Sequence, residues 1–216
     1  MTYIIRHMRS LTFVGDTESV ENNYRRLKER GTNKLDQVKN WLQENNHMEF
    51  DSRYTSPYLR SRTLAHYISP KETWEETPLL SERNKGDFTL ILPEERKMKF
   101  PREDKSMQEN LFYAKPPNGE SFFDLYCRTI LFLQNIKGER VLASTSGGNI
   151  YIMRMILEGW SVEKFNTIMT TRDTKDRIYN GHVLEYRGNL NGKFSEMRSV
   201  CTTDTRLTSN EWRVVD

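Results

Sequence analysis

Four short polar stretches of the sequence carry the side chains that could do chemistry. They read RHM from Arg6, SPYLRSRTLA from Ser56, LLSERNKGDF from Leu79 and STSGGN from Ser144. The first stretch follows Tyr3-Ile4-Ile5, an apolar run typical of a short buried strand. Ligands of open α/β sheets bind at the carboxyl ends of strands. Arg6 and His7 are therefore either a working pair for an anion or only the polar end of a strand.

The residue types in the first three stretches match the needs of phosphoryl transfer. Arg6 and Arg60 each offer a planar fork of donors that fits phosphate oxygens. His7 can attack phosphorus when its imidazole is neutral, and Glu82 can give a proton to a leaving oxygen. Because catalysis of this reaction is mostly positioning and charge stabilisation, these groups could supply it.

Strand-like and helix-like segments alternate along the chain, which predicts the elements that position these stretches. Strands are expected at residues 3–5, 50–56 and 139–146, and in two pieces around Asn180-Gly181 within residues 176–188. Helices are expected at residues 27–45, 57–68, 149–160 and 162–169. Ser56-Pro57 reads as the start of the second helix, and Gly147-Gly148 reads as a turn into the third. This order predicts an α/β fold, a three-layer sandwich with a mostly parallel central sheet.

The length of the chain predicts a single domain over residues 1–216. The alternation of strand-like and helix-like segments is interrupted once. Residues 84–115 are dense in charge and contain Pro93 and Pro101. This segment is either an insertion or lid over the edge of the sheet, or a solvated loop without a role.

Composition excludes several classes of protein. The net charge of +3 and the charged fraction of 29% describe an ordinary surface and disfavour a nucleic-acid binder. No apolar run approaches the roughly 18 residues of a membrane span, and the N-terminus lacks a signal-peptide pattern. Cys127 and Cys201 form no CxxC or Cys/His cluster, so we expect no structural metal and a cytoplasmic protein.

Six stretches in the same order resemble the histidine phosphatase superfamily, also called the phosphoglycerate mutase-like family. YIIRHMRS resembles its RHG box, and SPYLRSRTLA its SPLxRAxxTA box. LKERGTNKLDQVKNWL, LLSERNKGDF and VLASTSGGNI are similar to three further boxes. PPNGESFFDLYCRTILFL resembles a PPGGES segment and carries Glu120, Ser121, Asp124 and Arg128. Each match alone is weak, but six in order over residues 3–186 are specific, and they favour Arg6-His7 as a working pair.

The resemblance implies a role for each site residue. His7 would become phosphorylated, and Arg6, Arg60 and the box around Gly147 would hold the phosphoryl oxygens. Glu82 would be the proton donor and later the base that activates water.

The sequence departs from the family pattern at Ser146, where the family has a second pocket histidine, and at Met8, where it has glycine. Loss of one charge-stabilising donor costs on the order of 10²–10³ in rate, roughly 3–4 kcal/mol. Ser146 is therefore either an introduced change in an active natural enzyme, or the natural residue of a weak enzyme or non-catalytic binder. We favour the first account because the rest of the pocket is intact.

The sequence thus predicts a metal-independent, cofactor-free phosphomonoester hydrolase that acts through a phosphohistidine and is crippled by Ser146. Its substrate would be a small phosphorylated metabolite or nucleotide, and it would bind phosphate. The alternative is a non-catalytic relative that binds a phosphorylated ligand or partner protein. Hydrolysis is favoured over mutase chemistry because the 84–115 segment is short and no paired-arginine stretch is found. A homodimer is left open.

Overall fold

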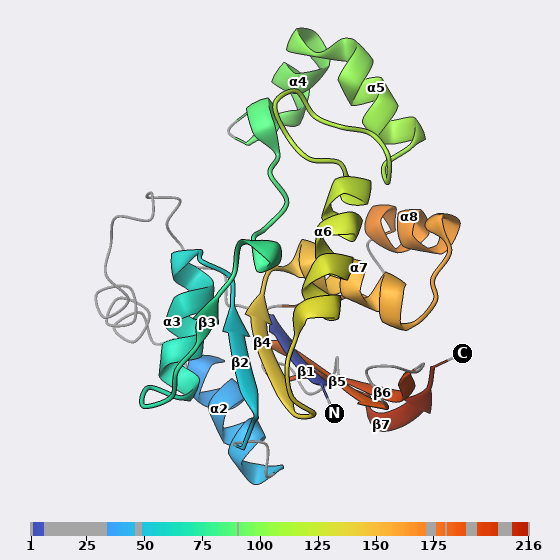
Figure 1. Cartoon of the computed structure of the whole chain (residues 1–216). Coiled ribbons are helices and arrows are strands. Elements are labelled where there is room, and N and C mark those ends of the chain that lie inside the picture. Colours follow the sequence, from blue (N-terminus) through green and yellow to red (C-terminus); the bar gives the residue numbers. More distant parts are fainter. Residues whose placement is uncertain are drawn as a thin grey trace.

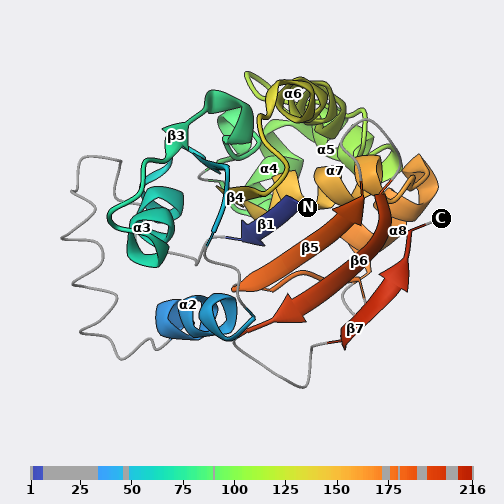
Figure 2. The same ribbon diagram turned by 60° about the horizontal axis from the view of Figure 1, so that its bottom comes forward.

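The computed structural model of the chain describes residues 2–6, 34–45, 49–89, 91–171, 176–179, 181–188, 194–202 and 209–215. Within these ranges one sheet has the strand order β3-β2-β4-β1-β5-β6-β7. The strands are β1 (Thr2–Arg6), β2 (Ser52–Thr55), β3 (Glu75–Glu76), β4 (Val141–Thr145), β5 (His182–Gly188), β6 (Phe194–Cys201) and β7 (Ser209–Val214). Strands β3, β2, β4 and β1 pair in parallel, whereas β5, β6 and β7 continue the sheet in antiparallel pairing (Figure 2).

The predicted α/β class is confirmed. The strands expected at residues 3–5, 50–56 and 139–146 are β1, β2 and β4, and they form the parallel half of the sheet. Strands β6 and β7 of the antiparallel half were not predicted, since they carry none of the apolar runs on which the prediction depended. The parallel half alone bears the candidate site.

The prediction of two strand pieces within residues 176–188 is wrong for the first piece. Only the second piece forms a strand, β5. The N–H of His182 donates to the carbonyl oxygen of Tyr179 at 3.2 Å, and its Nδ1 accepts the N–H of Tyr179 at 2.7 Å. These bonds close a tight turn and occupy backbone groups that a strand would need for pairing.

Helices cover both faces of the sheet, which gives the three layers that the sequence predicts (Figures 1 and 2). On one face, α2 (Lys34–Glu44) and α3 (Leu59–Ile68) pack their apolar side chains against Leu142 of β4 and Val183 of β5. On the other face, α6 (Phe122–Asn135) and α7 (Gly147–Leu157) pack against Val141 and Ala143. Helix α8 (Val162–Thr170) packs on α6 and α7. In the described part of the chain, no helix is both long and apolar enough to span a membrane.

Helix α3 begins two residues later than the sequence predicts. Its N-cap is Tyr58, which has extended backbone and no side-chain capping hydrogen bond, so Ser56-Pro57 is not the cap and first turn. Ser56 is held by the sheet instead, because its N–H donates to the carbonyl oxygen of Ser144 at 2.9 Å. The extended course of β2 therefore continues past its last residue, and Arg60 lies in the first turn of α3.

Strand β4 runs directly into α7, without the separate glycine turn that the sequence predicts. Ser146 is the N-cap, with φ −87° and ψ 162°, and its carbonyl oxygen accepts the N–H of Ile150 at 3.1 Å. Gly147 and Gly148 form the first turn of the helix. The positive end of the α7 dipole consequently lies at the carboxyl end of β4.

The 84–115 segment is folded into helices where the structure describes it. It contains the 3-10 helix η2 (Gly86–Phe88), then α4 (Pro93–Lys99) and α5 (Pro101–Glu109), which project beyond the layers of the sheet (Figure 1). The rings of Phe88 and Phe100 lie 5.6 Å apart, and Arg96 forms an ion pair with the buried Asp104. These contacts stabilise the segment as a helical excursion rather than a solvated loop. Its role as a lid stays a prediction.

The two ends of this excursion meet at a stem, formed by residues 84–87 and 117–120. The N–H of Asp87 donates to the carbonyl oxygen of Pro117 at 3.0 Å. Gly86 has φ +49°, and a Cβ placed on it would lie 2.0 Å from that same oxygen. A Cβ on Gly119 would lie 2.8 Å from the carbonyl oxygen of Asn84. The backbones of the stem therefore approach as closely as only glycine permits.

We expect Gly86→Ala to lower the free energy of unfolding by at least about 2 kcal/mol, since it adds left-handed strain to a steric overlap. Urea unfolding followed by circular dichroism measures this loss. The matched control is Lys85→Ala, because Lys85 is exposed and its replacement should change stability by less than about 0.5 kcal/mol. Equal stability of the two variants would show that the stem can shift to make room.

Candidate functional site

The candidate site begins at the carboxyl ends of three neighbouring parallel strands. Arg6, the last residue of β1, is paired with Thr145, the last residue of β4. Thr55, the last residue of β2, is paired with Ser144. The backbone of Arg6 therefore ends at the same edge of the sheet as Ser146, whereas His7 lies outside the described residues.

Two of the predicted site residues, Arg60 and Glu82, form an ion pair although they are 22 positions apart. The side chain of Arg60 is 22% exposed and that of Glu82 is 35% exposed, so solvent reaches the pair. The guanidinium group of Arg60 also lies 4.6 Å from the ring centre of Tyr58. Because a guanidinium group carries five N–H donors, pairing with Glu82 leaves Arg60 able to bind a second anion.

Ser146 is buried at the start of α7. Its Oγ lies 3.1 Å from Nδ2 of Asn149, from which it accepts a hydrogen bond, and it does not cap a backbone N–H of the helix. The serine hydroxyl is thus engaged inside the protein. The sequence pattern did not identify Asn149 as a functional residue, although it ends the STSGGN stretch.

Glu82 belongs to an irregular segment, residues 78–84, which starts with the 3-10 helix η1 (Pro78–Leu80). The carbonyl oxygen of Leu80 accepts from Oγ1 of Thr145 at 2.8 Å and from Nδ2 of Asn149 at 3.1 Å. The same Nδ2 lies 2.7 Å from the carbonyl oxygen of Ser81. These bonds attach the 78–84 segment to the corner between β4 and α7.

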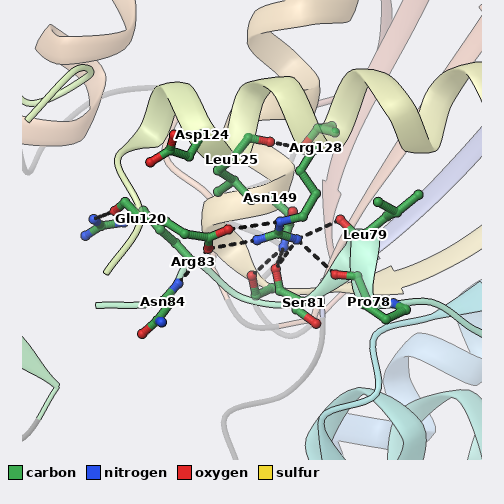
Figure 3. Close-up of polar contacts among 12 residues, drawn as sticks. Pro78, Leu79, Ser81, Arg83, Asn84, Glu120, Asp124, Leu125, Arg128 and Asn149 are labelled. Atoms are coloured by element: carbon green, nitrogen blue, oxygen red, sulfur yellow. Dashed lines mark hydrogen bonds and ion pairs between the residues drawn. The ribbon is translucent and has the colours of Figure 1, made fainter. Parts of the chain in front are cut away.

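Arg128 of α6 holds the same segment from another side (Figure 3). Its Nη1 donates to the carbonyl oxygens of Pro78, Leu79 and Ser81 at 3.1, 2.8 and 2.9 Å. The guanidinium group also pairs with both carboxylate oxygens of Glu120, from Nε at 3.2 Å and from Nη2 at 3.1 Å. Arg128 thus joins η1 to the residues that precede α6.

Glu120 in turn holds the far end of the segment. Its Oε2 accepts the N–H of Asn84 at 2.8 Å, and its own N–H donates to the carbonyl oxygen of Asn84 at 2.8 Å. Nη1 of Arg83 donates to the carbonyl oxygen of Glu120 at 2.7 Å. Burial lowers the pKa of Arg83, and the nearby charges of Glu120 and Glu82 oppose that shift. Sequence reasoning missed these contacts because each joins positions more than thirty residues apart.

The described residues therefore provide a cationic fork beside a carboxyl group, at the edge where β1 ends and α7 begins. A guanidinium fork and a helix N-terminus both favour an anion. The neighbouring carboxyl group can exchange a proton with the oxygen of a bound group. Within the described ranges, no three His, Cys, Asp or Glu side chains are grouped so as to hold a metal ion.

Comparison with known proteins gives related sequences and related structures. The chain is 28% identical over 128 residues to a 2,3-bisphosphoglycerate-dependent phosphoglycerate mutase of Bartonella henselae, a match that covers 54% of this chain and 62% of that protein. It is 26% identical over 166 residues to the mutase of the same name from Azorhizobium caulinodans, covering 71% and 76% of the two chains. The chain thus spans less than two thirds of the length of the first of these relatives.

Two solved structures show the same fold. The α-ribazole phosphatase of Shigella flexneri superposes with a TM-score of 0.64 at 15% identity, over 86% of this chain and 90% of that one. A mycobacterial glucosyl-3-phosphoglycerate phosphatase in complex with inorganic phosphate gives a TM-score of 0.65 at 15% identity, over 96% and 99% of the two chains.

A sequence model of one family covers most of the chain. It describes the histidine phosphatase superfamily (branch 1) and matches residues 2–178, which include β1, the Arg60–Glu82 pair and the start of α7. The related proteins named above are mutases and phosphatases. The chain belongs to the histidine phosphatase superfamily (branch 1).

Proposed function

We propose that the protein is a metal-independent phosphomonoester hydrolase that acts through a phosphohistidine at His7. The observation that carries this proposal is the ion pair of Arg60 with Glu82, beside the strand end from which His7 follows. A phosphate-binding cation and a proton donor are the two groups that a histidine nucleophile needs for transfer of a phosphoryl group.

In the first step, a ring nitrogen of His7 attacks the phosphorus atom of the substrate. The N–P bond forms as the bond from phosphorus to the leaving oxygen breaks, and Glu82, in its protonated form, gives its proton to that oxygen. In that form Glu82 is no longer the ion partner of Arg60, whose guanidinium group then serves the phosphoryl oxygens. Arg6 and Arg60 hold the phosphoryl oxygens, since their planar donors fit two oxygens at once. The N–H groups at Gly147 add the positive end of α7.

In the second step, the Glu82 carboxylate takes a proton from water. The water oxygen bonds to phosphorus, the N–P bond breaks, and inorganic phosphate leaves with His7 restored to its neutral form. Glu82 thus acts first as acid and then as base, as proton balance requires.

Among the residues that the structure describes, the contacts of two cations near Glu82 favour hydrolysis over mutase chemistry. A mutase must hold a second acidic group of its substrate as well as the transferred phosphate. Arg83 bonds to Glu120, and Arg128 bonds to Glu120 and to backbone carbonyls, so their donors serve the protein itself. The preferred substrate is therefore a small phosphorylated metabolite or nucleotide with one phosphoester group at the site.

A second candidate function is binding without catalysis, and Ser146 is the observation that favours it. Ser146 stands where the family has its second pocket histidine, and its Oγ accepts a hydrogen bond from Nδ2 of Asn149. The pocket would then hold a phosphorylated ligand or partner protein without efficient turnover.

The test is binding and hydrolysis in the presence of a chelator. We expect the protein to bind inorganic phosphate in calorimetric titrations and to hydrolyse p-nitrophenyl phosphate slowly with EDTA present. Arg60→Ala should weaken phosphate binding by about 10-fold or more, because a charged hydrogen bond is lost. Arg62→Ala is the matched control, since Arg62 lies on the same helix and pairs with Glu76 instead. Absence of phosphate binding at millimolar concentration would remove the basis of the proposal.

A further inference from the structure

The geometry points to Arg128 and Glu120 as positioning residues that hold the carboxyl group of Glu82 in its reactive place. This inference deepens the proposed function and rests on it. It assigns these two side chains to proton transfer, although neither is placed to touch the reacting phosphate.

The inference begins with how the 78–84 segment is fixed (Figure 3). After η1 the segment has no regular secondary structure, so its backbone lacks the ladder of bonds that a helix or strand would supply. Arg128 binds three carbonyl oxygens near its start. At its end the Glu120 carboxylate accepts the N–H of Asn84, and the backbone N–H of Glu120 donates to the carbonyl oxygen of Asn84. Glu82 lies between the two attachments.

The two attachments depend on each other. Arg128 and Glu120 form a two-bond ion pair, with side chains only 17% and 27% exposed. Bidentate pairing fixes the orientation of both groups. Loss of either side chain would leave the other charge poorly satisfied and would remove part of the attachment at one end of the segment. Arg128 and Glu120 thus act on Glu82 as one unit.

Attachment by these residues determines where the Glu82 carboxyl group lies relative to Arg60. Arg60 belongs to α3, whereas Glu82 follows η1, so their contact depends on the backbone position of the 78–84 segment. A displacement of about 1 Å at a reacting group can cost about 10²-fold in rate. A contact with only a structural role would lower the stability of the protein. It would not lower the rate for substrates with poor leaving groups more than the rate for substrates with good ones.

The experiment measures hydrolysis of two substrates that differ in their need for a proton. Phenyl phosphate has a poor leaving group that must be protonated, whereas dinitrophenyl phosphate has a good one that need not be. We expect Arg128→Ala to lower kcat/KM for phenyl phosphate by about 10²-fold and to change kcat/KM for dinitrophenyl phosphate by less than about 3-fold. The ratio kcat/KM reports formation of the phosphohistidine and not its later hydrolysis, in which Glu82 acts as base for both substrates. Arg128→Lys should fall between the parent and Arg128→Ala, because lysine keeps the charge but not the fork. The dissociation constant of inorganic phosphate should stay within about 3-fold of the parent, since the phosphate ligands are unchanged.

A double-mutant cycle shows whether Arg128 acts through Glu82. Once Glu82→Gln has removed the acid, adding Arg128→Ala should cost little more on phenyl phosphate, because the two changes remove one function. Arg102→Ala is the control for loss of an arginine, since Arg102 is exposed on α5. Thermal unfolding of each variant shows that it is folded before its rate is compared.

The outcomes separate the inference from the function on which it rests. Equal losses of kcat/KM on both substrates, or additive losses in the double mutant, would overturn positioning and leave the hydrolase intact. A folded parent that hydrolyses neither substrate would overturn the proposed function and the inference with it.

Discussion

Replacement of Ser146 by histidine is expected to raise kcat for an aryl phosphate by about 10²–10³-fold, because an imidazole donor would then meet the charge that develops on the phosphoryl oxygens. The serine Oγ cannot do this, as it is short, neutral and engaged with Asn149 inside the protein. The start of α7 stays in place, since the backbone of Ser146 and not its side chain begins the helix. Steady-state kinetics with p-nitrophenyl phosphate measures the gain.

Ser146→Gln is the matched control for this gain. Glutamine has similar length but no positive charge, so it should recover at most a small part of the rate. A gain with histidine alone supports a crippled hydrolase. Unchanged turnover in Ser146→His, with phosphate binding retained, would instead favour the non-catalytic binder.

Replacement of His7 by alanine is expected to abolish the acid-labile phosphoenzyme and to lower kcat by about 10⁴-fold or more, since loss of a nucleophile removes the covalent route. The fall in kcat is best measured in the Ser146→His protein, because its starting rate should be highest. Rapid quench with labelled substrate and acid treatment of the trapped protein measures the intermediate.

His47→Ala controls for loss of a histidine, because His47 belongs to none of the six family stretches. It should keep both turnover and the trapped intermediate. Phosphate that still attaches to the protein after His7→Ala, in an acid-labile form, would assign the nucleophile to another residue.

Local sequence patterns predicted those parts of the fold where a pattern, such as an apolar run or a capping serine, is compatible with only one kind of element. An apolar run such as Val141-Leu142-Ala143 is buried on both faces, and it is a central strand. Ser161 begins α8 as a serine cap should, with its Oγ accepting the N–H of Lys164 at 3.2 Å. The family boxes likewise named Arg60 and Glu82, and these two side chains meet.

Contacts between distant segments could not be predicted in this way. Arg154 lies in the apolar helix α7 and is 1% exposed. Helical spacing offers Glu158, four positions on, as a partner, but no local pattern indicates Asp176 or Arg213. Arg154 pairs with Glu158 at 2.6 Å and with Asp176 at 2.7 Å, and Arg213 of β7 joins both acids. Burial opposes the charge, but the hydrogen bond and charge of Glu158 outweigh it and raise the pKa of Arg154.

The carbonyl contacts of Arg128 were hidden for a related reason. Sequence comparison with family boxes named Glu120 and Arg128, but gave them no task. The contacts of Glu120 and Arg128 depend on the backbone of residues 78–84. This segment is irregular after η1, so its sequence shows no helical or strand periodicity from which its course could be predicted. Every residue has a backbone carbonyl oxygen, so the residue types in a sequence do not show which carbonyl oxygens a distant arginine will bind.

The stem at Gly86 and Gly119 determines which part of the chain can vary without changing the sheet and the residues around Glu82. Because the chain leaves and returns at one point, the helices beyond it form a module whose length and composition can vary at little entropic cost. Glu120 belongs to the stem, and Arg128 and Glu82 lie outside the module, so none of the three is part of the helices that would be exchanged. A module of different length or composition could therefore be attached at the same stem without any change to the residues around the carboxyl group of Glu82.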